Sequence, residues 1–173
     1  WGWEVFPLLL LFWMENVVVG ALNALKILLA APGEARLWAA KAFTLPFFCF
    51  HYGLFTLLHG VFVLTVFGGK GYEVHDPLSV LGAALRAASD YGLWLAAAVL
   101  AASHAFSFAW NYLHRGEFRG ASPKALMARP YGRVMVLHMV IIVGGFGALA
   151  LGSPLWALLL LVILKTALDL RAH

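Results

Sequence analysis

Five long apolar stretches dominate this chain and decide the solvent in which it folds. A helix needs about 20 mainly apolar residues to cross a hydrocarbon core that is ~30 Å thick. Hydrophobic residues make up 63% of the 173 residues and charged residues only 12%, against roughly 25% charged residues in soluble domains. Lipid must therefore be part of the solvent. The sequence predicts an all-α, polytopic transmembrane helix bundle that forms one domain over residues 1–173, with about five spanning helices at about residues 5–30, 43–67, 91–113, 133–151 and 154–168.

A short helix is predicted between the second and third spans. Asp76 is followed by Pro77, which is the pattern of an N-cap residue and a proline at the first helical position. We expect a helix over about residues 77–88 that lies at the membrane interface. Cys49 is the only cysteine, so a disulfide within the chain and a cysteine metal cluster are excluded.

The distribution of lysine and arginine predicts an orientation. The loop over residues 115–133 holds five basic residues against Glu117 alone. With five spans, this loop shares one side of the membrane with the loop after the first span and with the C-terminus, and basic loops remain cytoplasmic. The sequence therefore predicts an outside N-terminus and a cytoplasmic C-terminus. Topology explains the basic loop, so no nucleic-acid partner is expected.

The first stretch carries polar residues on one face at membrane depth. At about 100° per residue, Glu15, Asn16, Gly20, Asn23 and Lys26 fall within about 140° of arc. Ionisable groups inside a bilayer are costly, which makes Glu15 a candidate functional residue. The alternative is a helix–helix interface in which Gly20 allows close approach and asparagines bond across it. Lys26 has a further alternative, because its side chain can snorkel to the membrane surface.

Histidines recur in each of the next three stretches. His51 and His59 are ~12 Å apart along one helix axis, so these two cannot bind the same ion. His51, His104 and His138 each lie a few residues to the cytoplasmic side of the middle of their stretch. At ~1.5 Å per residue, these three imidazoles come within a few Å of one plane. The pattern therefore allows three histidines from different helices to converge.

A metal site is the function that this pattern favours. We expect His51, His104 and His138 as ligands, with zinc as the default metal and iron or copper as alternatives. Zinc on three histidines activates a bound water, for which Glu15 or His59 would be the catalytic proton acceptor. Haem between two of the histidines is a less favoured alternative, and histidines that only bond across helices are the structural one. The polar residues expected to support the ligands are Asn23, Ser107 and Asn111.

Three function classes follow from these patterns. The first is a metal-dependent membrane enzyme that acts on a lipid or another hydrophobic substrate. The second is a small transporter or proton relay, in which Glu15, His59 and a polar stripe on the third span line a path. The stripe consists of Ser103, His104, Ser107, Asn111 and His114. The third is a structural or accessory subunit that packs against a partner. Association of several copies of the chain is left open.

Several short runs resemble a known family. They are W-M-E-N-V-V-V-G-A-L-N-A-L-K over residues 13–26, H-Y-G over 51–53, H-G over 59–60, N-Y over 111–112 and P-Y-G-R-V-M-V-L-H over 130–138. Together they resemble a family of small prokaryotic integral membrane proteins known only as a domain of unknown function. The resemblance covers nearly the whole chain and implies a prokaryotic inner membrane, but it implies no activity. Members of that family have a further apolar segment ahead, which suits a chain that begins with Trp1 rather than Met.

Overall fold

The computed structural model describes residues 5–72, 74–76, 78–151, 163 and 166, with only the backbone described at 70 and over 144–151. Within these residues the chain is all-helical, as predicted, and its one strand-like feature is an isolated bridge between Ala31 and Arg119. The long elements are α1 (Val5–Leu29), α2 (Ala35–Phe62), α3 (Ser79–Asp90), α4 (Trp94–Ser107), α5 (Pro123–Ala128) and α6 (Tyr131–Leu151). Three short elements complete them: the π-helical segments η1 (Val63–Phe67) and η3 (Phe108–His114), and the 3-10 turn η2 (Gly69–Gly71).

Three helical segments of the described chain are long and apolar enough to cross a membrane: Val5–Leu29, Ala35–Phe67 and Pro123–Val143. A fourth candidate is the pair Ser79–Asp90 and Trp94–His114, which passes only when both helices are taken together and is bent by 114°. About five spans were predicted, and the described residues contain three candidates, or four if the bent pair is one span. The predicted span over 154–168 lies outside the described residues.

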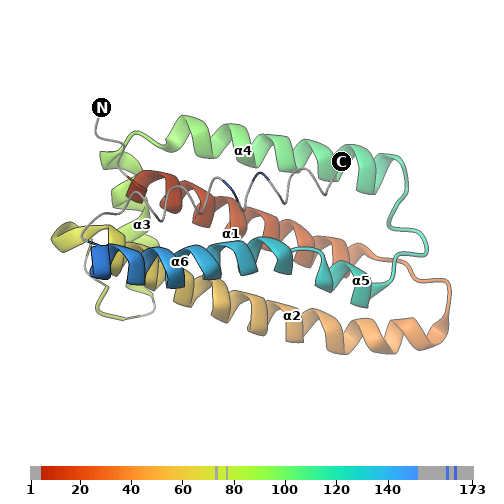
Figure 1. Cartoon of the computed structure of the whole chain (residues 1–173). Helices are drawn as coiled ribbons and strands as arrows, with labels where there is room; N and C mark the ends of the chain where they lie inside the picture. The colour runs from red at the N-terminus through yellow and green to blue at the C-terminus, as the bar shows by residue number, and fades with distance from the viewer. Residues whose placement is uncertain (1–4, 73, 77, 152–162, 164–165, 167–173) are drawn as a thin grey trace.

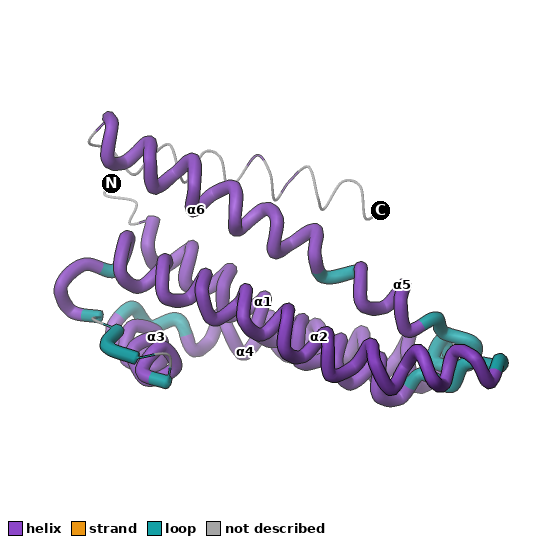
Figure 2. Tube along the Cα trace, turned by 90° about the horizontal axis from the view of Figure 1, so that it is seen from below, coloured by secondary structure: helices purple, strands orange, loops and turns teal. Residues whose placement is uncertain are grey.

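Helix α1 is the centre of the bundle. It contacts α2, α3, α4, α5 and α6, and it runs between α4 and α2 (Figure 1). Seen from below, α3 lies across one end of the bundle, and α5 and the neighbouring loops lie at the other end (Figure 2). Every long helix can therefore direct side chains toward α1.

Helix α2 begins earlier than the apolar stretch that predicted it. The helix starts at Ala35 instead of about residue 43 and passes through Pro46 without ending. Its first two turns carry Arg36 and Lys41, and the ammonium group of Lys41 donates a hydrogen bond to the carbonyl oxygen of Ala30 at 2.9 Å. Hydropathy detects only the apolar part of a helix. The first turns of α2 are polar, so the apolar stretch in the sequence begins later than the helix does.

Helix α3 forms close to the predicted position but packs into the bundle. The Asp76 side chain accepts hydrogen bonds from the backbone N–H groups of Leu78 and Ser79, at 2.8 and 3.0 Å. This confirms the capping role expected for Asp76. The helix then buries a stripe of small residues against its neighbours, which allows close contact with α1 and α2. The stripe consists of Val80, Ala83, Ala84, Ala87 and Ala88.

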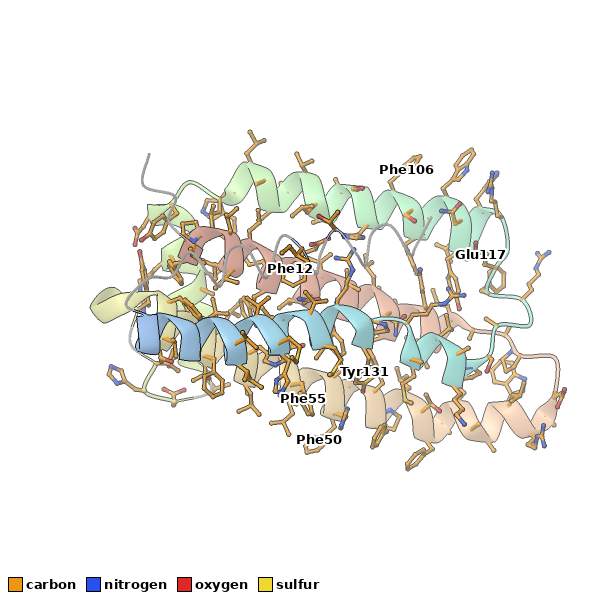
Figure 3. All side chains as sticks on the ribbon, in the orientation of Figure 1. Phe12, Phe50, Phe55, Phe106, Glu117 and Tyr131 are labelled. Carbon is orange, nitrogen blue, oxygen red and sulfur yellow. The ribbon has the colours of Figure 1, made fainter. Side chains whose placement is uncertain are left out.

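The apolar core is divided into two clusters along α1. One surrounds the beginning of α1, around Leu9 and Trp13, and the other surrounds its end, around Ile27 and Tyr52 of α2. Large apolar side chains also lie on the outside of the bundle, and Figure 3 has Phe50 on the outer side of α2 and Phe106 on the outer side of α4. Phe50 is 72% exposed and Phe106 is 68% exposed, as expected for side chains that face lipid.

Candidate functional site

The Glu15 carboxylate is the most deeply buried charged group among the described residues. Its side chain is 4% exposed, and one oxygen, Oε1, receives two partners. Nε2 of His104 on α4 lies 2.9 Å from this oxygen, and a guanidinium nitrogen of Arg133 on α6 lies 2.6 Å from it. We call Glu15, His104 and Arg133 the ionic triad. Three different helices therefore meet at one buried carboxylate oxygen.

The triad defines the tautomer of His104. A carboxylate oxygen can only accept a hydrogen bond, so Nε2 of His104 must carry the proton that it donates to Glu15. In the neutral ring the other nitrogen, Nδ1, is then an acceptor. The His104 side chain is 26% exposed, and His104 lines a cavity beside α1. His104 thus donates to Glu15 and keeps an acceptor nitrogen on a side chain that lines the cavity.

This cavity has a volume of about 140 Å³ and is bordered by α1, α4, η3 and the junction of α5 and α6. Its apolar wall includes Phe108 and Pro130. A π-helical segment begins at Phe108, next to the cavity, and such segments often occur at functional sites. The remaining wall is polar, and half of its residues are cations. It consists of Asn23, Lys26, His104, Ser107, Arg129 and Arg133.

The other predicted metal ligands have different partners. Nδ1 of His51 lies 2.6 Å from the hydroxyl oxygen of Tyr131, which Figure 3 has at the start of α6. Nδ1 of His138 lies 3.1 Å from Nε2 of His59, which is itself only 4% exposed. The structure thus divides His51, His104 and His138 among three separate contacts. The described residues contain no group of three His, Cys, Asp or Glu side chains that could hold a metal ion.

The two predicted proton acceptors also lie in different contacts. Glu15 is part of the ionic triad, whereas His59 pairs with His138. Their helices direct them toward different neighbours. His59 is directed toward α6, and Glu15 reaches both α4 and α6.

Of the three residues expected to support the metal ligands, two line the cavity and the third bonds to one of them. The amide nitrogen of Asn23 donates to the backbone carbonyl of Leu126 on α5 at 3.0 Å. The amide nitrogen of Asn111 donates to the hydroxyl oxygen of Ser107 at 3.2 Å, one turn away. Asn23 and Ser107 line the cavity, so the polar stripe of the third predicted span does face protein at Ser107.

Sequence reasoning missed Arg133 as a functional residue. Arg133 was counted only as a loop charge that sets topology, because it lies at the edge of an apolar stretch. It is in fact the third residue of α6. Its backbone N–H donates to the Pro130 carbonyl oxygen at 3.1 Å, and its side chain extends to Glu15. The available signal was a single buried carboxylate, which required a cation from some other span.

The fold and the triad together define a class: an all-helical protein with several candidate membrane spans and a buried carboxylate shared by a histidine and an arginine. Within that class, the chain belongs to a family of unknown function, DUF6498, whose model matches residues 1–173. This confirms the resemblance to a domain of unknown function. Comparison with curated proteins and with solved structures gave no match.

Proposed function

We propose that the protein carries out acid–base chemistry within the membrane, on an amphiphilic molecule held in the cavity beside the ionic triad. The observation that carries this proposal is the buried Glu15 carboxylate bonded to His104 and Arg133 at the cavity wall. A carboxylate that holds one imidazole nitrogen orients the ring and leaves the other nitrogen as a proton acceptor. His104 is then the proton-exchanging group, Glu15 orients it, and Arg133 compensates the charge of Glu15.

This proposal keeps the enzyme hypothesis and the hydrophobic substrate but changes the roles of the residues. His104 becomes a proton-exchanging group instead of a metal ligand. Lysine and arginine alone would make the cavity a binding site, whereas His104 adds an imidazole nitrogen that can accept a proton from a bound molecule. The two basic loops pair through Ala31 N–H to Phe118 O at 2.9 Å, which supports their lying on one side of the membrane. We propose that this is the cytoplasmic side of a prokaryotic inner membrane, with the C-terminus on the same side.

The test compares wild-type protein with a His104→Gln variant in nanodiscs made from total prokaryotic membrane lipid. Glutamine keeps an N–H donor for Glu15 but cannot exchange a proton at neutral pH. Mass spectrometry of the lipids before and after incubation measures turnover. We expect the variant to lose about 100-fold or more in rate, which is the contribution typical of a positioned acid–base group.

His114→Gln is the matched control. His114 is the last residue of η3 and stacks on Trp110, with ring centroids 4.7 Å apart, and it does not line the cavity. Its variant should turn lipid over like the wild type. Equal turnover by folded His104→Gln and wild type would overturn the proposal. A wild type without turnover that conducts protons into vesicles, with conduction lost in His104→Gln, would replace the enzyme with a proton relay.

A metal site is the second candidate, and the His59–His138 contact favours it. Two nitrogen ligands at 2.0–2.1 Å from a tetrahedral zinc ion are about 3.4 Å apart. The observed separation of 3.1 Å between His59 Nε2 and His138 Nδ1 is close to this value. A small rotation of one ring would admit an ion, with water or a further group completing its coordination.

Elemental analysis of purified protein tests this candidate. If zinc, iron or copper binds at this pair, His138→Ala and His59→Ala should each lose it, while His51→Ala should retain it because His51 contacts Tyr131 instead. Loss of metal in His51→Ala and His104→Ala together would restore the original three-histidine ligand set. A Soret absorbance band would indicate haem.

A further inference from the structure

We propose that the cavity between α1, α4 and the α5–α6 junction binds a phosphate group. This inference names the chemical class of the molecule in the proposed function and rests on it for its biological meaning, although binding can be measured without turnover. The cavity volume of about 140 Å³ is several times the ~30 Å³ that one water molecule occupies in the liquid. The space therefore suits a tetrahedral oxyanion.

The cavity has an excess of positive charge. Lys26, Arg129 and Arg133 line it, and Glu15 pairs with Arg133. Among the described residues, no carboxylate lies within 4.0 Å of the charged nitrogens of Lys26 or Arg129. Among the described residues that line the cavity, three are cations and none is a carboxylate. The lining itself therefore favours an anionic ligand.

Hydrogen-bond donors complete the recognition of a phosphate. A guanidinium group has five N–H donors in a planar fork that matches phosphate oxygens, and Arg129 is exposed enough to turn this fork into the cavity. The Ser107 oxygen accepts the bond from Asn111, which leaves the Ser107 hydroxyl proton free to be donated. The Lys26 ammonium group lies 5.5 Å from the centre of the Tyr112 ring, which limits its positions while keeping its three donors available.

The position of the cavity along the bundle favours a phosphate that belongs to a lipid. Lys26 is three residues before the end of α1, which is ~5 Å along the helix axis. Arg129 follows the last residue of α5. The apolar part of the cavity wall, with Val19, Leu22 and Phe108, continues from these cations toward the middle of α1. An anionic headgroup at the level of the cations would therefore leave its acyl chains beside apolar side chains.

The experiment measures binding to the purified full chain in neutral detergent. Native mass spectrometry and the shift in unfolding temperature are recorded with four probes: short-chain phosphatidic acid, short-chain phosphatidylglycerol, short-chain phosphatidylcholine and inorganic phosphate. We expect phosphatidic acid to bind about tenfold or more tightly than phosphatidylcholine, since a charge-assisted bond to an unhindered phosphate is worth at least that factor. Binding of inorganic phosphate that displaces the lipid would identify free phosphate as the source of the ligand chemistry.

Variants tie the binding to the cavity. Arg129→Gln and Lys26→Gln should each weaken binding of phosphatidic acid about tenfold. Lys124→Gln is the matched control, because Lys124 is an exposed cation on α5 that does not line the cavity, and it should change affinity by less than about twofold. Arg129→Lys keeps the charge but lacks the planar fork, so its affinity should lie between those of the wild type and Arg129→Gln.

Two results would overturn the inference. One is equal affinity of the wild type for phosphatidic acid and phosphatidylcholine together with no binding of inorganic phosphate. The other is unchanged affinity in both Arg129→Gln and Lys26→Gln. Failure of the acid–base proposal has a different signature, namely a wild type that binds the phosphate lipid without converting it.

Discussion

At the scale of single residues, the Glu15 carboxylate and its two partners differ in how far they are removed from water. The Glu15 side chain is 4% exposed, whereas those of His104 and Arg133 are 26% and 27% exposed. A buried charge that loses its partner is costly because it has no water to replace the lost interaction. The side chains of His104 and Arg133 line the cavity and can instead turn toward it. Replacing Glu15 and replacing Arg133 should therefore change the stability of the protein by different amounts.

We predict that Arg133→Gln lowers the free energy of unfolding by roughly 3 kcal/mol, because it removes the guanidinium group that is bonded to the buried carboxylate. Glu15→Gln should cost less, since it removes the charge that needed compensation. The double variant should be no less stable than Glu15→Gln alone, because the two changes are coupled. Unfolding in mixed detergent micelles measures all three. Additive losses in the double variant would mean that the two side chains do not interact.

At the scale of helices, two glycines determine how closely α1 and α2 approach. A Cβ atom built on Gly20 of α1 would overlap the ring of Tyr52 on α2. A Cβ atom on Gly60 of α2 would lie 2.7 Å from the ring of Trp13 on α1. The same aromatic residues donate hydrogen bonds across the interface, Tyr52 to the Asn16 carbonyl at 2.9 Å and Trp13 to the Thr56 carbonyl at 2.7 Å. Small residues therefore allow these bonds to form.

We predict that Gly60→Ala destabilises the bundle by about 1–3 kcal/mol, because the added methyl group forces Trp13 and Val80 to move. Gly53→Ala on the same helix is the control, since a Cβ atom there has nothing within 4 Å. Alanine also favours a helix over glycine by up to ~1 kcal/mol, so this variant should be neutral or slightly more stable. The unfolding midpoints of the two variants, measured side by side, check the difference. Equal midpoints would mean that the α1–α2 contact can open without loss.

Sequence patterns predicted the faces of the helices better than their partners. The polar arc of α1 correctly contained Glu15, Asn23 and the close contact at Gly20, because a helical period fixes which side chains share a face. The same period cannot say which residue of another helix lies opposite. His104 and His138 therefore lie on helices that were predicted well, yet they meet Glu15 and His59 instead of each other. Which residues of two helices come into contact depends on the rotation and tilt of each helix, and these are set by packing at positions such as Gly60.

At the scale of the whole molecule, the ends of the bundle differ in charge. The loop after α1 and the loop after η3 meet at one end, where Gly120 N–H donates to the Ala31 carbonyl at 2.8 Å. Figure 3 has Glu117 at this same end, among the basic residues of the loop. Segment η2 and the start of α3 lie at the other end (Figure 1). The charge asymmetry that predicted the orientation thus coincides with the two ends of the folded bundle.

We predict that the loop after α1 is cytoplasmic and that η2 lies outside, because cytoplasmic loops retain lysine and arginine. Replacing the only cysteine, by Cys49→Ser, gives a background for two single-cysteine variants, Gly33→Cys and Gly71→Cys. Both glycines have open space where the new side chain would lie, so neither change should disturb the fold. A membrane-impermeant maleimide applied to spheroplasts should label the cysteine at position 71 and label that at position 33 only in inverted vesicles. Labelling of both positions from the same side would place the two ends of α2 together, which a helix that crosses the membrane from Ala35 to Phe67 does not allow.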